Sequence, residues 1–106
     1  MVNPYAGEVA VSINGQVHVA KLTLGALAEL ESAVGAPSLV ELAQRFESGA
    51  FSGRDVLALI VAGLRGGGWR GTAADLMTAD VAGGPIGAAR VAAELLARAF
   101  APPHQE

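Results

Sequence analysis

Glu8-Val-Ala-Val-Ser-Ile-Asn-Gly-Gln-Val-His-Val-Ala-Lys-Leu-Thr-Leu-Gly-Ala-Leu-Ala-Glu-Leu-Glu31 is the stretch that decides the fold. From Glu8 to Ile13, apolar residues alternate with small or polar ones, which is the period of a half-buried strand. Asn14-Gly15 is the strongest short signal for a hairpin, because both residues tolerate the positive φ of a type I′ turn. Residues 16–22 return as the second strand. The sequence therefore predicts an N-terminal β-hairpin.

The turn length decides which side chains share a face of this hairpin. A two-residue turn gives three pairs: Ile13 with Gln16, Val11 with His18, and Val9 with Ala20. This register places five apolar residues on one face, namely Val9, Val11, Ile13, Ala20 and Leu22. Val17 and Val19 then lie on the other face, which needs cover from the chain or from a partner. A three-residue loop with Gly15 in the left-handed conformation would instead bring Val17 and Val19 to the face of Val9 and Val11. We favour the two-residue turn.

A helix follows the hairpin without a linker. Thr23 supplies an N-cap oxygen. Four apolar residues fall at helical spacing on one predicted face, namely Leu24, Leu27, Leu30 and Val34. Gly35 and Pro37 end this helix. Ser38-Leu-Val-Glu41 is a capping box that opens the next helix. The apolar stripe predicted for this helix consists of Leu39, Leu42, Ala43 and Phe46. Gly49 ends the helix.

Three more helices are predicted from similar end signals. Ser52-Gly-Arg-Asp55 opens one whose residues 56–64 are apolar nearly all round, so we expect it at the centre of the fold. Gly66-Gly-Gly68 ends it. Thr72-Ala-Ala-Asp75 caps a short helix, and Pro85 begins a last helix that runs to about Phe100.

The length of 106 residues fits one domain, and the 52% hydrophobic content supplies a single modest core. We expect residues 1–100 to form a single α+β domain, with an N-terminal β-hairpin followed by a compact bundle of four to five helices. Residues 101–106 are expected to form a frayed C-terminal tail.

Composition argues against several classes of partner. The net charge is −3 and the 7 basic residues are scattered. Phosphate contacts need clustered Lys and Arg, so nucleic acid is not expected as a partner. The longest apolar run, 56–64, is about half of the ~20 residues that cross a bilayer, so no membrane partner is expected.

Residues 1–8 lack the features of a signal peptide, and the absence of cysteine excludes disulfides and thiolate metal sites. These features favour a cytoplasmic location.

Residue types that carry catalysis are present without a catalytic arrangement. His18 lies in a predicted strand with no second histidine nearby, and His104 lies in the Pro-rich tail, so neither shows metal-ligand spacing. Glu29 and Glu31 would point roughly 200° apart on a helix and cannot share a proton. No nucleophile elbow is present. We therefore expect no enzymatic activity, no cofactor and no metal.

Gly66-Gly-Gly-Trp-Arg-Gly71 superficially resembles a phosphate loop. It lacks the Gly-Lys-Ser/Thr ending and follows a helix, whereas a phosphate loop follows a strand. The simpler interpretation is a helix end, with Trp69 folded back on the core. In the alternative, Trp69 is exposed and anchors a partner with Arg70, because Trp and Arg are enriched at interface hot spots. The candidate partner-binding residues are Val17, Val19, Trp69 and Arg70.

Several of these segments together resemble a known family. They are Gly7-Glu-Val9, Asn14-Gly15, Leu22-Thr-Leu-Gly-Ala-Leu-Ala-Glu-Leu-Glu31, and the apolar helix with its Gly66-Gly-Gly68 exit. The family consists of small proteins from the tail-gene clusters of gene transfer agents and tailed phages. It is described as tail assembly chaperones or as tail-tube-associated proteins. The resemblance covers Gly7 to about Gly68, and the last helix more loosely.

The resemblance implies a protein that binds the tape-measure protein, a long helical and apolar-rich chain, before the tail tube polymerises around it. No catalytic residues are implied. We prefer a tail assembly chaperone that binds the tape-measure or other tail proteins, because a small, mainly helical chain offers few strands for a tube ring. The alternative is a structural tail or tail-tube-associated component of the particle. The resemblance thus implies a protein of the bacterial cytoplasm, or in the alternative one associated with the particle. A small regulatory protein-binding module is a further alternative, and a homo-oligomer stays open.

Overall fold

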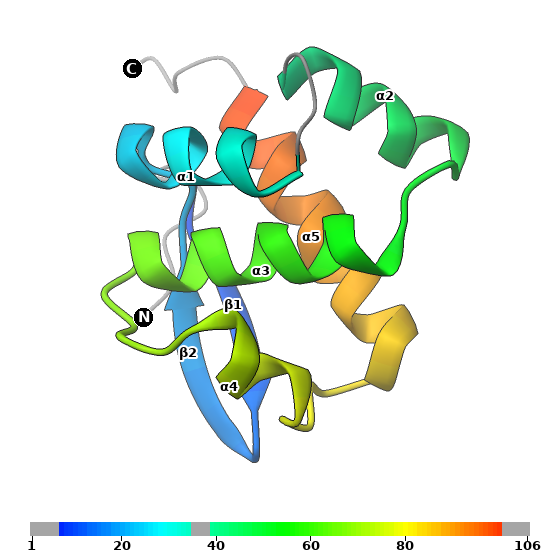
Figure 1. Ribbon diagram of the computed structural model, residues 1–106. Coiled ribbons are helices and arrows are strands. Elements are labelled where there is room, and N and C mark those ends of the chain that lie inside the picture. Colours follow the sequence, from blue (N-terminus) through cyan, green and yellow to red (C-terminus); the bar gives the residue numbers. More distant parts are fainter. Residues whose placement is uncertain (1–6, 35–38, 101–106) are drawn as a thin grey trace, which may run out of the picture.

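A computed structural model describes residues 7–34 and 39–100 of the chain (Figure 1). Its elements, in order, are β1 (Val9–Ile13), β2 (Gln16–Ala20), α1 (Leu24–Val34), α2 (Leu39–Ser48), α3 (Gly53–Gly66), α4 (Ala73–Met77) and α5 (Gly84–Phe100). The predicted α+β fold, a hairpin followed by a helical bundle, is confirmed. The predictions for Gly35, Pro37, Ser38 and the tail at 101–106 lie outside the described residues. None of the described helices has the length and apolar character that a membrane-spanning helix needs.

The hairpin has the two-residue turn. Asn14 and Gly15 adopt φ values of 51° and 80°, as a type I′ turn requires. Ile13 pairs with Gln16, and the register continues to the pair Val9–Ala20. The residues of the predicted core face that are buried are Val9, Val11, Ile13 and Ala20, and Leu22 packs at their margin. The register of the two-residue turn is thus confirmed, and the three-residue loop is wrong.

Residues 80–82, in the loop between α4 and α5, cover the outer edge of β1 beside the turn. Asn14 donates its backbone N–H to the carbonyl of Asp80 at 2.8 Å, and Ala82 donates to the carbonyl of Ser12 at 3.0 Å. The side-chain Oδ1 of Asn14 accepts the N–H of Asp80 at 2.9 Å. Asn14 therefore closes the turn and also anchors a loop 66 residues away in sequence. No local pattern in the sequence predicts this pairing.

Helix α3 lies at the centre of the fold, as predicted, and packs on α1, α4, α5 and β2 (Figure 1). Ser52 Oγ accepts the N–H of Asp55 at 3.1 Å, and Asp55 Oδ2 accepts the N–H of Ser52 at 3.0 Å. This is the predicted capping box. The box formed by Thr72 and Asp75 is confirmed at the start of α4.

The end of α3 lies so close to β2 that only glycine fits there. Lys21 donates its backbone N–H to the carbonyl of Gly63 at 2.8 Å. A Cβ at Gly66 would lie 2.0 Å from the carbonyl oxygen of Lys21, and one at Gly67 would lie 1.9 Å from that of Val19. The glycines that end the helix therefore also allow it to dock against the hairpin.

The predicted apolar face of α1 is wrong at its first position. Thr23 Oγ1 accepts the N–H of Ala26 at 3.1 Å, which confirms the N-cap. Leu24, however, is 86% exposed, whereas Ala26 and Leu30 are buried. Leu24 lies about 120° around the helix from Leu30, so it turns away from the side that packs on α3. The side chain of Val34 lies outside the described part.

Helix α2 is attached to the side of the domain and packs mainly on α5 (Figure 1). Of its predicted stripe, Leu42 is buried, and Ala43 and Phe46 are half-buried. The ring of Phe46 stacks on that of Phe51, with centroids 4.5 Å apart. The side chain of Leu39 is not among those described. Among the described side chains, Leu42 and Phe46 are therefore the large apolar ones that hold α2 in place.

Candidate interaction surfaces

Asp55 is the buried charged residue of the described part, and structural contacts engage both of its carboxylate oxygens. It is 4% exposed. Its Oδ1 lies 3.3 Å from Nη1 of Arg45, and its Oδ2 accepts the N–H of Ser52. Asp55 therefore links α2 to the start of α3. Within 7–34 and 39–100, no three His, Cys, Asp or Glu side chains are grouped to hold a metal ion.

The outer face of the hairpin carries the first predicted binding residues. Val17 is 69% exposed, and Val19 is half-buried. In the observed register Val17 pairs with Ser12 and Val19 with Ala10, so all four side chains lie on the face opposite the core. The face is therefore semi-apolar, as predicted. Its role in binding a partner stays a prediction.

The loop after α3 carries the other two predicted binding residues. Trp69 donates its backbone N–H to the carbonyl of Leu64 at 2.9 Å, and its half-buried side chain packs against the core. The indole also covers Gly71, where an added Cβ would lie 2.0 Å from Cζ2 of the ring. Arg70 is exposed. The tryptophan thus folds back on the core, and partner binding by Trp69 and Arg70 stays a prediction.

This loop adjoins the edge of β2. Gly67, two residues before Trp69, lies directly against the carbonyl of Val19. On the other side of the loop, Arg65 donates from Nη1 to the carbonyl of Gly71 at 3.3 Å. The structure therefore brings the loop and the end of β2 together, although they are far apart in sequence.

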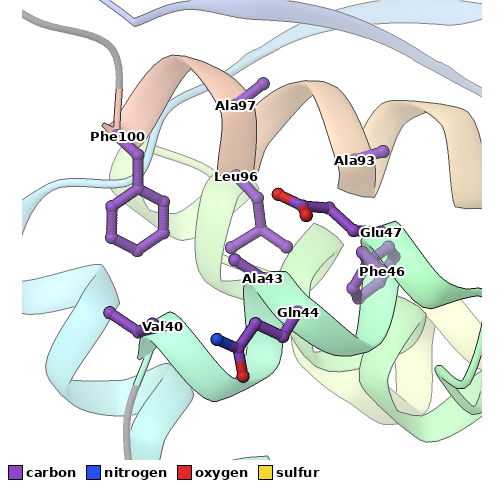
Figure 2. Close-up of a pocket in the computed structure, with 9 residues that line it drawn as sticks. All are labelled: Val40, Ala43, Gln44, Phe46, Glu47, Ala93, Leu96, Ala97 and Phe100. Atoms are coloured by element: carbon purple, nitrogen blue, oxygen red, sulfur yellow. The ribbon is translucent and has the colours of Figure 1, made fainter.

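A groove of about 500 Å³ lies between α2 and α5 (Figure 2). Nine residues line it: Val40, Ala43, Gln44, Phe46, Glu47, Ala93, Leu96, Ala97 and Phe100. Leu96 points from α5 toward Ala43, and the carboxylate of Glu47 points toward α5 (Figure 2). Val40 and Phe100 remain 58% and 49% exposed. The groove is therefore largely apolar and open to solvent, with one carboxylate beside it.

An apolar stripe extends along α5 beyond the groove. It contains Ile86, Ala93 and Phe100, which are spaced seven residues apart and so lie on one side of the helix. Ile86 is 74% exposed, and Ala93 is exposed as well. The groove borders Ala93 and Phe100 but not Ile86. The first turns of α5 thus present a large apolar side chain that α2 does not cover.

Two opposite charges flank this stripe. Glu47 lines the groove, and Arg90 is exposed one turn after Ile86. The ion pairs among residues 7–34 and 39–100 are Arg45–Asp55, Arg65–Glu29 and Arg98–Glu94. Glu47 and Arg90 therefore have no charged partner within the described part.

A comparison with known protein families matches residues 6–102 to the family described as phage tail tube protein, GTA-gp10. The chain belongs to this family. The match spans the hairpin and the helices from α1 to α5, and it confirms the resemblance to gene transfer agent and phage tail proteins. The chain is therefore a phage-like tail component, and the description of the family favours the structural alternative over a chaperone. Neither curated proteins nor solved structures gave a match.

The groove and the stripe of this tail protein were not predicted from the sequence. The spacing of Ile86, Ala93 and Phe100 is visible in the sequence and could have indicated an apolar line along the last helix. The groove has no such local signal. It depends on how α2 leans against α5, which contacts between distant residues determine.

Proposed function

We propose that this protein is a structural component associated with the tail tube, and that it remains in the assembled phage-like particle. The match over residues 6–102 carries the proposal, because it covers nearly the whole chain and the family is one of tail tube proteins. The exposed apolar residues support a binding role, since such patches are typical of interaction sites. We also propose that the protein is not an enzyme.

The hairpin face and the adjoining loop are the proposed contacts with other tail proteins. Val17 offers a β-branched side chain that is 69% exposed, and Arg70 is exposed in the loop beside β2. A pair of short strands with one exposed face can pack against a neighbouring subunit, or it can add strands to the sheet of that subunit. These contacts would hold the protein against the tube.

Quantitative mass spectrometry of purified particles tests the structural role. The expected result is that the protein is retained at a fixed ratio to the principal tail protein across independent preparations and after a high-salt wash. Abundance in lysates together with absence from purified particles would contradict a structural role. A cytoplasmic protein of the same host, followed through the purification, controls for carry-over.

An assembly chaperone for the tape-measure protein is the second candidate. The observation that favours it is the small sheet, since the described residues form two strands, whereas tail-tube rings usually use larger β-rich subunits. In this case, co-expression should raise the soluble yield of the tape-measure protein, and a pull-down should recover the complex. No enrichment over a bead control, with several segments of the tape-measure protein, would exclude this candidate.

A further inference from the structure

We propose that Asn14 is a site of spontaneous covalent modification, at which water replaces the side-chain amide through a cyclic imide. We propose also that the docking of residues 80–82 on β1 controls the rate of this reaction. The inference rests on the sequence of the hairpin turn and on the contacts that hold the turn. It goes beyond the proposed role in the tail and does not depend on it.

The sequence of the turn supplies the reacting groups. Asn14-Gly15 is the one Asn-Gly pair of the chain, and the other asparagine, Asn3, precedes a proline. Glycine has no side chain to shield its backbone nitrogen, whereas proline has no N–H to lose. Asn14 and Gly15 are both exposed, so water reaches the turn. Asn14 therefore has the neighbour that this reaction needs, and Asn3 does not.

The reaction consumes one water and releases one ammonia. The backbone nitrogen of Gly15 loses its proton to solvent and bonds to Cγ of Asn14, while the bond from Cγ to Nδ2 breaks and Nδ2 leaves as ammonia. Water then opens the cyclic imide at one of its two carbonyl carbons. Opening at Cγ gives aspartate, and opening at the backbone carbonyl carbon gives isoaspartate, in which the chain continues through Cγ. No oxidant or reductant takes part.

The type I′ turn holds the two reacting atoms apart. Asn14 has a φ of 51°, and the left-handed conformation combines such a φ with a ψ of about 30–50°. At this ψ the nitrogen of Gly15 lies nearly opposite Cβ across the Cα–C bond, so it cannot approach Cγ. The attack requires nearly half a rotation about that bond, and this rotation opens the turn.

The loop between α4 and α5 keeps the turn closed. Oδ1 of Asn14 accepts the N–H of Asp80 at 2.9 Å, and the N–H of Asn14 donates to the carbonyl of Asp80 at 2.8 Å. Ala82 donates to the carbonyl of Ser12 at 3.0 Å, and the half-buried side chain of Val81 packs against the core. One loop thus fixes both the side chain and the backbone of Asn14. The reaction proceeds only in the fraction of molecules in which this loop has left β1.

The isoaspartate product cannot rebuild this arrangement. It adds one carbon atom to the backbone of a turn that fits two ordinary residues. The contacts of residue 14 with Asp80 are then lost, and the carbonyl of Ser12 becomes available at the edge of β1. An uncovered strand edge can pair with another chain. Modification of Asn14 would therefore open a strand edge that the unmodified chain covers.

Incubation of the full chain in native buffer and in denaturant, at one pH and one temperature, tests the site and its protection. Peptide mass spectrometry, with chromatographic separation of aspartate from isoaspartate, follows both products. Asn14 should convert in both samples, and at least about tenfold more slowly in the folded chain, because only the open fraction reacts. Asn3 is the internal control in the same samples and should not convert.

A substitution in the loop tests its control of the rate. Ala82→Pro removes the N–H that bonds to Ser12, so Asn14 should convert about tenfold faster in native buffer. Ala73→Pro is the matched control, because it makes the same kind of change at the first position of α4, where proline is tolerated and the preceding Thr72 is already extended. It should leave the rate unchanged. Circular dichroism verifies that both variants keep their helices.

Amide hydrogen exchange on the separated isoaspartate form tests the effect on the loop without any variant. The N–H of Ala82 should lose its protection from exchange. The N–H of Lys21, which bonds to the carbonyl of Gly63 at the edge of β2, should keep its protection. Lys21 thus controls for a general loosening of the hairpin.

Four results would overturn the proposal. They are an Asn14 that does not convert in denaturant, equal rates in the folded and the denatured chain, equal rates in the two proline variants, and an isoaspartate form in which Ala82 stays protected. None of these measurements involves particles or tail proteins. Failure here therefore differs from failure of the proposed structural role.

Discussion

The hairpin and α2 are attached to the rest of the domain in different ways. At the hairpin, backbone atoms make the joint, because Lys21 bonds to the carbonyl of Gly63 at 2.8 Å and the last turn of α3 packs directly on β2. At α2, side chains make the joint, through the 3.3 Å contact between Arg45 and Asp55 and the stack of Phe46 on Phe51. No side chain fits at Gly66 or Gly67, where the last turn of α3 contacts the hairpin. The packing of α2, in contrast, leaves a groove beside α5.

This difference determines where a partner's side chain could enter between two elements of the domain. Backbone contacts between β2 and the last turn of α3 leave no space between these two elements, although Val17 on the outer face of β2 stays exposed. Side-chain contacts at α2 leave apolar surface uncovered beside α5. Binding surfaces on a rigid scaffold commonly lie where packing is incomplete.

The largest expected effect on stability comes from adding a side chain where the end of α3 contacts the backbone of the hairpin. Gly66→Ala would place a Cβ 2.0 Å from the carbonyl oxygen of Lys21, a contact that only movement of the backbone can relieve. We expect it to lower the free energy of unfolding by about 4 kcal/mol or more, as measured by urea denaturation. Gly53→Ala is the matched control, because its added Cβ meets open space, and it should change stability by less than about 0.5 kcal/mol. Equal effects of the two substitutions would show that the close approach is not tight.

A smaller effect on stability is expected at the side-chain contacts that link α2 to the start of α3. Asp55→Ala removes a buried capping carboxylate that also contacts Arg45, and it should cost about 1–3 kcal/mol. Asp75→Ala removes the same type of capping interaction at an exposed site and should cost only about 0.5–1 kcal/mol. Thermal unfolding of both variants measures the difference. Equal costs would mean that the link between α2 and α3 contributes little.

Local signals predicted most of the fold. The positive φ values at Asn14 and Gly15, the N-cap at Thr23 and the two capping boxes depend on residues within a few positions of one another, and all were confirmed. The register followed from the turn, because a two-residue loop leaves only one pairing. These features need no knowledge of the remaining chain.

Features that depend on distant contacts were not predicted. The exposure of Leu24 depends on which side of α1 faces α3, and helical spacing alone does not say this. The pairing of residues 80–82 with β1 joins segments that are far apart in sequence. The groove likewise arises from the placement of α2 on α5. Val17 and Arg70 are exposed, and their role in binding stays a prediction, whereas no pattern in the sequence indicates the groove.

The smallest effect on stability is expected at the outer face of the hairpin. Replacing Val17 and Val19 together with Thr keeps β-branched side chains, and Val17 is 69% exposed, so the free energy of unfolding should fall by less than about 1 kcal/mol. Ile60→Ala, at a position 1% exposed, should instead cost about 2–5 kcal/mol. If this face binds tail proteins, the double Thr variant should also show reduced incorporation into particles, whereas its melting curve stays close to that of the wild type. A melting temperature that falls as far as that of Ile60→Ala would show that the two valines stabilise the monomer and are not a free surface.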